Sequence, residues 1–321
     1  MRLAIIGVVW AIAAIAGVAI ESDYLVSVAT TMVFLGLWAQ SWNVLSGLTG
    51  NISLGHSVFV AVAAYVTIIL QQRGLSPLIG GVLGVAAAVI LAAIIGAATL
   101  RLRGPYFTLA TLSAAAVVLS LILHYSDLTG GPSGIAITFA HDAPLELEFT
   151  NVRAYYLIAT TLLAAVTIVI SLLRRSKLGF YIAAIKSSEE VAAAAGIRVA
   201  LVKVTVFCVS AALTALGGVV YVFYIGFADP NFLSGLTLSV QIALTAVVGG
   251  TGYLVGPIVG AMFYEAIDAA ANAAFGAAGG WDVMILGFSV VAIVLSEPRG
   301  LCEMAVRLVR AIAGRMQSAV A

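Results

Sequence analysis

The sequence has few charged residues and almost no cysteine. Only 9% of its 321 residues are Asp, Glu, Lys or Arg, against roughly 25% in ordinary soluble domains. The two cysteines, Cys208 and Cys302, do not form a C-x-x-C pair, so we expect free thiols, no disulfide framework and no metal site. These absences argue against a soluble domain and against a metal-binding or disulfide-stabilised scaffold.

Sequence patterns of nucleotide-binding sites and of catalytic sites are also missing. No G-x-x-x-x-G-K-[ST] run occurs, so a P-loop is not expected. The glycine runs LTGGPSG and VVGGTGYLVG lack the lysine and border apolar segments. No Ser–His–Asp order, zinc spacing or nucleophile elbow indicates catalysis, and a net charge of +1 gives no reason to expect nucleic acid. We therefore expect no catalytic residues, no cofactor and no enzyme activity.

Long apolar segments dominate what is present. The chain is 63% hydrophobic, its mean hydropathy is +1.16, and the strict alternation of a membrane β-barrel does not appear. Such runs are typical of an all-α, polytopic transmembrane helical bundle forming a single domain over 1–321. We place ten apolar segments at 3–20, 24–46, 52–70, 78–100, 106–124, 154–173, 204–224, 237–250, 255–275 and 282–296. Glycine-rich stretches predict broken or re-entrant segments near 46–55 and 247–257.

The distribution of basic residues predicts the orientation of the bundle. If the N-terminus is cytoplasmic, only Arg73 and Arg153 of the 15 Lys and Arg residues fall in external loops. The positive-inside rule therefore favours ten spans with both termini in the cytoplasm. This topology leaves a long external loop at 125–153 and a long cytoplasmic loop at 174–203.

The cytoplasmic loop carries a short helix signal, SSEEVAAAAG. Ser187 precedes Glu190 by three residues, which is the spacing of a capping box. Glu189 adds negative charge in the first turn, the alanines favour helix, and Gly196 can end it in a left-handed conformation. We expect a helix of two or three turns that begins after Ser187.

Two interpretations of this helix are open. It is either a compact interfacial connector or a docking element for a soluble partner. The alanine-rich face would let a partner approach closely, and the preceding SKLGFYIAAIK offers the apolar anchors Phe180, Tyr181, Ile182 and Ile185. A simple connector would need neither feature, which favours docking.

Five ordered stretches resemble permease subunits of the branched-chain amino acid (LIV) class of ABC importers, in the order of the LivM-type subunit. They are SWNVLSGLTGNISLGHSVFVAVAAY, RLRGPYFTLATL, DLTGGPSGI, SKLGFYIAAIKSSEEVAAAAGIRVALVKVTVF and VVGGTGYLVGPIVGA. In the fourth, Glu190, Ala192 and Gly196 match the EAA pattern of importers, without its I-x-L-P ending. The resemblance implies that the cytoplasmic loop couples to ATPases through Phe180, Ser187, Glu189, Glu190, Ala192 and Gly196. It also implies a multi-pass protein of the bacterial inner membrane with a second permease subunit (a heterodimer), two cytoplasmic ATPase subunits and a periplasmic solute-binding protein.

Polar residues within or beside the spans are candidates for a substrate pathway. Each also has a structural interpretation, such as helix-start packing or back-bonding to its own helix. They are Asn43, Asn51, Ser53, His56, Thr108, Thr111, Glu265 and Asp268. Glu265 and Asp268 share a helix face with Asn272, and carboxylates within a membrane are costly unless paired or functional.

By resemblance, the expected function is import of branched-chain or other hydrophobic amino acids by alternating access driven by separate ATPases. Urea, short amides and aromatic acids are alternative substrates within the same class. A proton-coupled secondary transporter that uses Glu265 and Asp268, or a channel for small neutral solutes, is an alternative of another class. Neither of these would need a docking helix.

Overall fold

The computed structural model describes residues 2–102, 104–137, 146–275, 281–297, 300–304 and 307. Most of these residues are helical, as the apolar composition predicts. The helices are α1 (Arg2–Ala19), α2 (Asp23–Thr49), α3 (Ser57–Gln72), α4 (Pro77–Thr99), α5 (Pro105–His124), α6 (Ser126–Thr129), the 3₁₀ helix η1 (Gly131–Ser133), α7 (Val152–Leu173), α8 (Lys177–Ser187), α9 (Glu189–Ala194), α10 (Val199–Ile225), α11 (Pro230–Leu233), α12 (Leu236–Gly249), α13 (Gly256–Phe275) and α14 (Trp281–Ser296). Two strands, β1 (Ile135–Ala136) and β2 (Phe227–Ala228), pair antiparallel.

Each of the ten predicted apolar segments overlaps one of the longer helices. Among the described residues, five helices are long and apolar enough to cross a membrane: α2, α4, α5, α7 and α10. Ile6–Ala19 of α1, together with α3 and α12, are shorter apolar helices. The all-α prediction is therefore confirmed, while ten complete spans and cytoplasmic termini stay predictions.

Both predicted breaks interrupt helical structure. α2 continues to Thr49, residues 50–56 are irregular, and α3 begins only at Ser57. α12 ends at Gly249 and α13 begins at Gly256. Gly50, with φ +83°, and Gly250, with φ +114°, stand directly after the two helices, in a backbone region that only glycine adopts readily.

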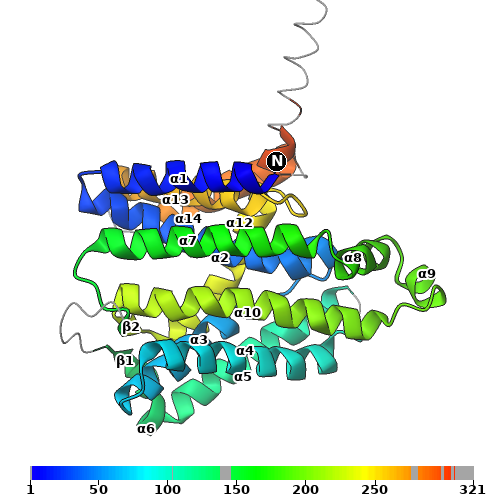
Figure 1. Ribbon diagram of the computed structural model, residues 1–321, viewed down its shortest axis with the longest axis horizontal. Coiled ribbons are helices and arrows are strands. Elements are labelled where there is room, and N and C mark those ends of the chain that lie inside the picture. Colours follow the sequence, from blue (N-terminus) through cyan, green and yellow to red (C-terminus); the bar gives the residue numbers. More distant parts are fainter. Residues whose placement is uncertain are drawn as a thin grey trace, which may run out of the picture.

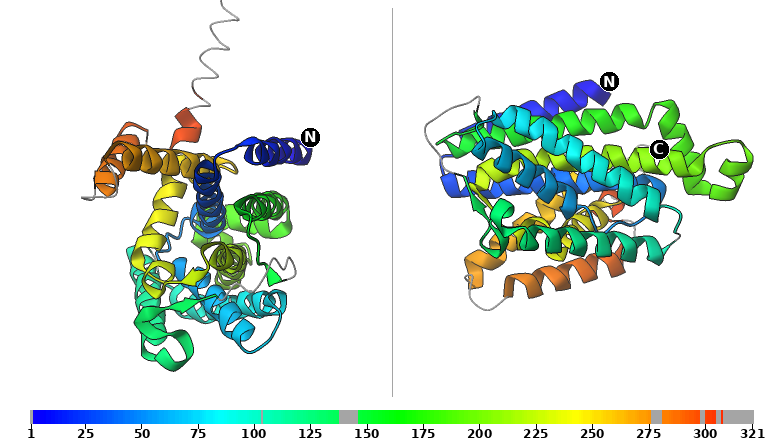
Figure 2. Two further views of the ribbon diagram at one scale, coloured as in Figure 1. Left: turned by 90° about the vertical axis from the view of Figure 1, so that its left-hand side faces the viewer. Right: turned by 90° about the horizontal axis from the view of Figure 1, so that it is seen from below.

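The long helices run side by side and give the bundle two distinct ends (Figure 1). α8 and α9 project at one end, called here the α8–α9 end, and β1, β2 and α6 lie at the other. α2 and α10 are central: they pack on each other, α2 also packs on α7 and α13, and α10 on α3 and α4. α1 lies at the periphery against α7 (Figure 2).

The interior combines large apolar side chains with close helix contacts. Phe34 and Trp38 of α2 meet Tyr221 of α10, with ring centroids 5.2 and 4.9 Å from that of Tyr221. Where α10 crosses α3, a Cβ on Gly218 would lie 2.6 Å from the Val60 carbonyl oxygen. Small residues at such crossings let helices in membranes approach closely.

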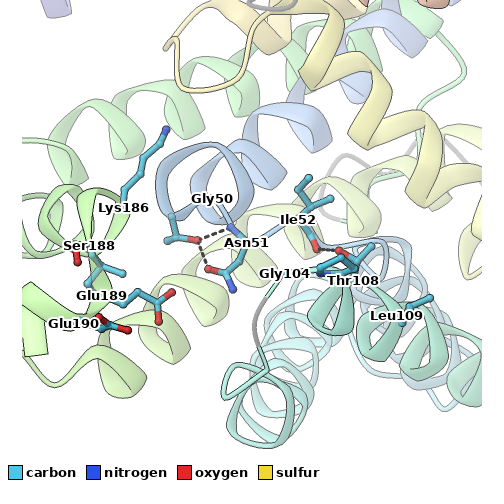
Figure 3. A pocket seen from close by; sticks show the side chains of 13 residues that line it. Gly50, Asn51, Ile52, Gly104, Thr108, Leu109, Lys186, Ser188, Glu189 and Glu190 are labelled. Carbon is cyan, nitrogen blue, oxygen red and sulfur yellow. Dashed lines mark hydrogen bonds between the residues drawn. The ribbon is translucent and has the colours of Figure 1, made fainter.

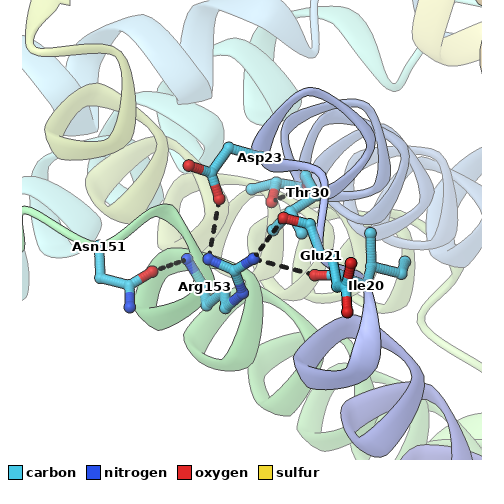
Figure 4. A network of polar contacts seen from close by, with 7 residues as sticks. Ile20, Glu21, Asp23, Thr30, Asn151 and Arg153 are labelled. Atoms are coloured by element: carbon cyan, nitrogen blue, oxygen red, sulfur yellow. Dashed lines mark hydrogen bonds and ion pairs between the residues drawn. The ribbon is translucent and has the colours of Figure 1, made fainter.

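The predicted external loop is partly structured. Its described residues include α6, η1 and β1, and β1 pairs with β2 at the end of α10; residues 138–145 of this prediction lie outside the described part. Arg153, at the start of α7, binds the chain that follows α1 (Figure 4). Its Nη1 donates to Asp23 at 2.8 Å, and its Nη2 donates to the carbonyl oxygens of Ile20 and Glu21 at 2.9 and 3.0 Å. Arg153 thereby fastens α1 to α7.

Candidate functional site

A cavity of about 970 Å³ opens at the α8–α9 end of the bundle. Its walls come from the break after α2, from the start of α5 and from the α8–α9 segment (Figure 3). It is lined by Thr49, Gly50, Asn51, Ile52, Gly104, Pro105, Thr108, Leu109, Ile185, Lys186, Ser188, Glu189 and Glu190. Two of the predicted pathway residues and two of the predicted coupling residues therefore line one cavity.

α8 has one face packed on the bundle and one face exposed. Ser176 caps the helix by accepting a hydrogen bond from the Gly179 amide at 3.4 Å. Ile182 and Ile185 are each only 2% exposed, whereas Phe180 is 71% exposed. The expectation that all four apolar residues are available to a partner is wrong for the two isoleucines, because they face the protein core. Phe180 and Tyr181 remain on the surface.

The predicted capping box at Ser187 is also wrong. Ser187 is the last residue of α8, and its hydroxyl donates to the Ala183 carbonyl oxygen at 3.1 Å. Ser188 has the extended backbone of an N-cap and accepts a hydrogen bond from the Val191 amide at 3.4 Å. α9 is also shorter than predicted, with six residues, which is under two turns.

The C-terminal end of α9 agrees with the sequence prediction. Gly196 has φ +85°. Its amide donates to the Ala193 carbonyl oxygen at 3.0 Å, and the Ile197 amide donates to that of Ala192 at 3.1 Å. This is the hydrogen-bond pattern of a Schellman motif, which turns the chain sharply toward α10.

The coupling candidates on α9 face different surroundings. Glu189 forms an ion pair with Lys203 of α10, whose side chain is only 2% exposed. Ala192 is 2% exposed and packs in the core, whereas Glu190 and Val191 are exposed. The outward surface of α9 is therefore formed by Glu190, Val191, Ala193 and Ala194, and Ala192 sets how closely α9 approaches the bundle.

The opposite wall of the cavity joins the first break to α5. The hydroxyl of Thr108 donates to the Ile52 carbonyl oxygen at 2.8 Å, and Thr111 accepts a hydrogen bond from the Leu54 amide at 3.1 Å. Asn51 is half-buried and lines the cavity. Thr108 and Asn51 thus border open space, whereas Thr111 is 1% exposed and supports the irregular backbone from behind.

Ser53 and His56 belong to a buried hydrogen-bond chain. The two ring nitrogens of His56 lie 3.0 Å from the Ser53 hydroxyl and 2.9 Å from the Ser210 hydroxyl. Ser210 in turn donates to the Ser41 carbonyl oxygen at 2.6 Å. Both His56 nitrogens are therefore used, and the chain ties the first break to α2 and α10.

Asn43 joins the two broken regions. Its side-chain oxygen accepts from the Gly252 amide at 2.9 Å, and its side-chain nitrogen donates to the Tyr253 carbonyl oxygen at 3.0 Å. Gln40, one turn earlier, donates to the Leu254 carbonyl oxygen at 2.7 Å. α2 therefore holds the 250–255 turn through side-chain amides.

Sequence reasoning missed four residues that act at this end: Gln40, Arg174, Lys186 and Lys203. Lys186 donates to the Gly47 carbonyl oxygen at 2.7 Å, and Arg174 donates to the carbonyl oxygen of Gly252. In the sequence the cations counted only toward membrane orientation. Their position at the boundaries of apolar helices is the available signal, because such side chains often satisfy helix-end carbonyls.

The acidic candidates of α13 lie away from the cavity. Glu265 is 7% exposed, and Asp268 accepts a hydrogen bond from Asn272 at 3.1 Å. Their shared helix face is as predicted. Among the described residues, no group of three or more His, Cys, Asp or Glu side chains could hold a metal ion.

Comparison with known proteins gives one matching family model, described as the branched-chain amino acid transport system permease component, over residues 24–294. The high-affinity branched-chain amino acid transport system permease protein LivM of Escherichia coli is 28% identical over 87% of this chain and 70% of its own length. The fructose import permease protein FruG of Bifidobacterium longum is 25% identical over 78% of this chain and 75% of its own length. The ribose import permease protein RbsC of Bacillus subtilis is 25% identical over 78% and 77%. No solved structure gave a significant match.

Proposed function

The chain belongs to the family of branched-chain amino acid transport system permease components, and on that premise we propose that it is the membrane subunit of an ATP-driven importer. It is a multi-pass membrane protein, and we place it in the bacterial inner membrane. A second permease subunit would complete a heterodimer, two cytoplasmic ATPase subunits would supply the energy, and a periplasmic solute-binding protein would deliver the substrate.

The observation that carries this proposal is the α8–α9 segment. It projects from one end of the bundle (Figure 1) and exposes Phe180, Glu190 and Val191 beside a cavity. Ile182, Ile185 and the Glu189–Lys203 ion pair hold the opposite face on the bundle. A helix that is firmly attached on one side and exposed on the other is suited to receive movement from a soluble partner. A channel or a secondary transporter has no need of such an element.

For the substrate we propose a branched-chain or other hydrophobic amino acid. The LivM relative is named for branched-chain amino acid transport, and it covers more of this chain than FruG or RbsC. A sugar is the second candidate, because FruG and RbsC are named for fructose and ribose import. Urea, short amides and aromatic acids remain alternatives within the first class.

We assign the pathway candidates three kinds of role. Asn51 and Thr108 line the cavity and are proposed to meet the substrate at the α8–α9 end. Asn43, Ser53, His56 and Thr111, all buried within hydrogen-bond networks, are proposed to shape the wall. Glu265 and Asp268 are proposed to belong to the pathway deeper in the bundle.

The test is uptake of radiolabelled leucine, and separately of ribose and fructose, by source cells that lack this gene and carry it on a plasmid. We expect leucine uptake that is restored by the wild-type chain, requires ATP and survives a protonophore. Glu190→Lys should abolish uptake and the co-purification of the ATPase encoded with this chain, whereas Glu190→Gln should retain both. Protein level and membrane insertion are measured for each variant.

Four outcomes would contradict parts of the proposal. Uptake that collapses with the protonophore and with Glu265→Gln would indicate proton coupling. Equilibration of leucine by the purified chain alone in liposomes would indicate a channel. Normal uptake by Glu190→Lys would exclude α9 as the docking element. Restored uptake of ribose or fructose, but not of leucine, would identify a sugar and not an amino acid as the substrate.

A further inference from the structure

Two cations, one just after α7 and one in the last turn of α8, bind carbonyl groups where the two broken regions meet. We call this place the Gly47–Gly252 junction: Gly47 lies in the last turn of α2, and Gly252 lies in the turn between α12 and α13. Lys186 donates to the Gly47 carbonyl oxygen at 2.7 Å, and Arg174 donates to that of Gly252. Asn43 closes the junction from the bundle side through both of its amide atoms.

The accepting carbonyls have no place in a regular helix. Gly47 is among the last four residues before the end of α2, whose carbonyls lack intrahelical donors. The Gly252 carbonyl belongs to an irregular turn. Polar backbone groups that are hidden from water need a partner, and a cation also suits the negative end of a helix. Lys186 and Arg174 supply these partners, so α8 is attached to the end of α2 and the α7–α8 connection is attached to the 250–255 turn.

The position of the two cations makes α8 a rigid connection. Arg174 immediately follows α7, and Lys186 lies in the last turn of α8. Between them, Ile182 and Ile185 are buried against the core. Ser188 alone separates α8 from α9. A displacement of α9 is therefore not absorbed by a flexible linker before it reaches α8.

We propose that Arg174 and Lys186 are positioning residues that pass movement of α9 to the broken ends of α2, α12 and α13. The inference rests on the proposed function, in which α9 meets the ATPase. Lys186 also lines the cavity, but the role proposed for the two cations does not depend on contact with the substrate or with ATP. They act through the two carbonyl groups. Their loss should leave docking of the ATPase on α9 intact but prevent movement of α9 from reaching the broken ends of the bundle helices.

The experiment compares transport with ATP hydrolysis in the purified importer complex, reconstituted with the ATPases, second permease and binding protein encoded with this chain. Lys186→Met, Arg174→Met and the double variant are measured. For the double variant we expect unchanged co-purification of the ATPase, continued ATP hydrolysis and a fall of about tenfold in substrate imported per ATP, as for an ordinary coupling free energy. Lys186→Arg should restore coupling. Lys177→Met, which removes an exposed charge from the same helix, is the matched control.

Normal import per ATP in the double variant would overturn the inference. Loss of ATPase co-purification together with transport would also overturn it, because the cations would then serve docking. If the methionine variants do not insert, two glycines placed between Ser187 and Ser188 provide the second test: docking should persist and coupling should fall, and normal coupling would refute transmission through α8. Failure of the proposed function itself is distinguishable, since the wild-type complex would then show no ATP dependence.

Discussion

Gly47 of α2 and Gly252 of the turn after α12 approach so closely that a side chain at Gly47 would have no room. A Cβ there would lie 3.0 Å from the Gly252 nitrogen and 1.7 Å from the Asn43 side-chain oxygen. The contact therefore fixes the distance between two segments more than 200 residues apart in the sequence. It also fixes the position of the carbonyl that Lys186 binds.

Gly47→Ala is accordingly expected to destabilise the protein, because the new methyl group displaces Asn43 from its two hydrogen bonds. Overpacking of this kind costs about 1–3 kcal/mol. The measurement is thermal denaturation of the purified chain in detergent. Gly7→Ala is the control, since its Cβ would meet nothing within 4 Å. Equal melting temperatures for the two variants would contradict the described contact.

The existence of this junction could be predicted only in part. The glycine-rich stretches placed both breaks correctly, because glycine weakens helices and permits left-handed turns. Their meeting in space depends on how α2 packs against α13, which apolar periodicity does not specify. The predicted helix ends also differ from those in the structure by several residues. α2 continues past the predicted end at 46 to Thr49, and α3 begins at Ser57 instead of at 52. Local polar hydrogen bonds decide such ends.

Two adjacent serines give a direct test of where α9 begins. Ser188 accepts the hydrogen bond from the Val191 amide, whereas Ser187 bonds back into α8. Ser188→Ala should therefore loosen the first turn of α9 by about 1 kcal/mol, the usual cost of a lost N-cap. Hydrogen exchange of amides 189–195 should become faster in Ser188→Ala and stay unchanged in Ser187→Ala. Faster exchange in Ser187→Ala, with no change in Ser188→Ala, would instead support the capping box at Ser187 that the sequence suggested.

The error at Ser187 has a simple physical origin. The sequence S-S-E-E offers two serines, and the spacing from Ser187 to Glu190 fits a capping box. However, α8 continues through Ser187, and a residue inside one helix cannot have the extended backbone that caps the next. The sequence analysis recognised α9, its acidic first turn and its Gly196 terminus, but not α8 as a separate helix. Which residues of these helices face the core also required the structure.

Arg153 is expected to matter more than its ionic partner Asp23. Asp23 has a side chain that is 73% exposed, and surface ion pairs contribute about 0–1 kcal/mol. Arg153 also binds two carbonyl oxygens at the end of α1, so Arg153→Ala removes three interactions. We predict a larger fall in melting temperature and faster proteolysis between α1 and α2 for Arg153→Ala than for Asp23→Ala. Identical behaviour would mean that the carbonyl contacts do not hold α1.

The ion pair between Glu189 and Lys203 should respond unequally to loss of its two members. Lys203 is 2% exposed, whereas the Glu189 side chain is 34% exposed. Glu189→Gln leaves a buried ammonium without its charged partner, which is costly in a protein interior. Lys203→Met replaces that ammonium by an apolar group of similar length and leaves Glu189 with access to water. We therefore expect Glu189→Gln to lower the melting temperature more than Lys203→Met does.

Transport measurements on variants of the same ion pair distinguish an effect on stability from an effect on coupling to ATP hydrolysis. Both variants lose the ionic attachment of α9 to α10, so both should import less substrate per ATP than the wild type. Glu189→Gln/Lys203→Met should recover most of the stability lost in Glu189→Gln without recovering transport, because the buried charge is gone but the attachment is still missing. Recovery of transport in the double variant would show that burial of Lys203, and not its bond to α9, is what the importer requires.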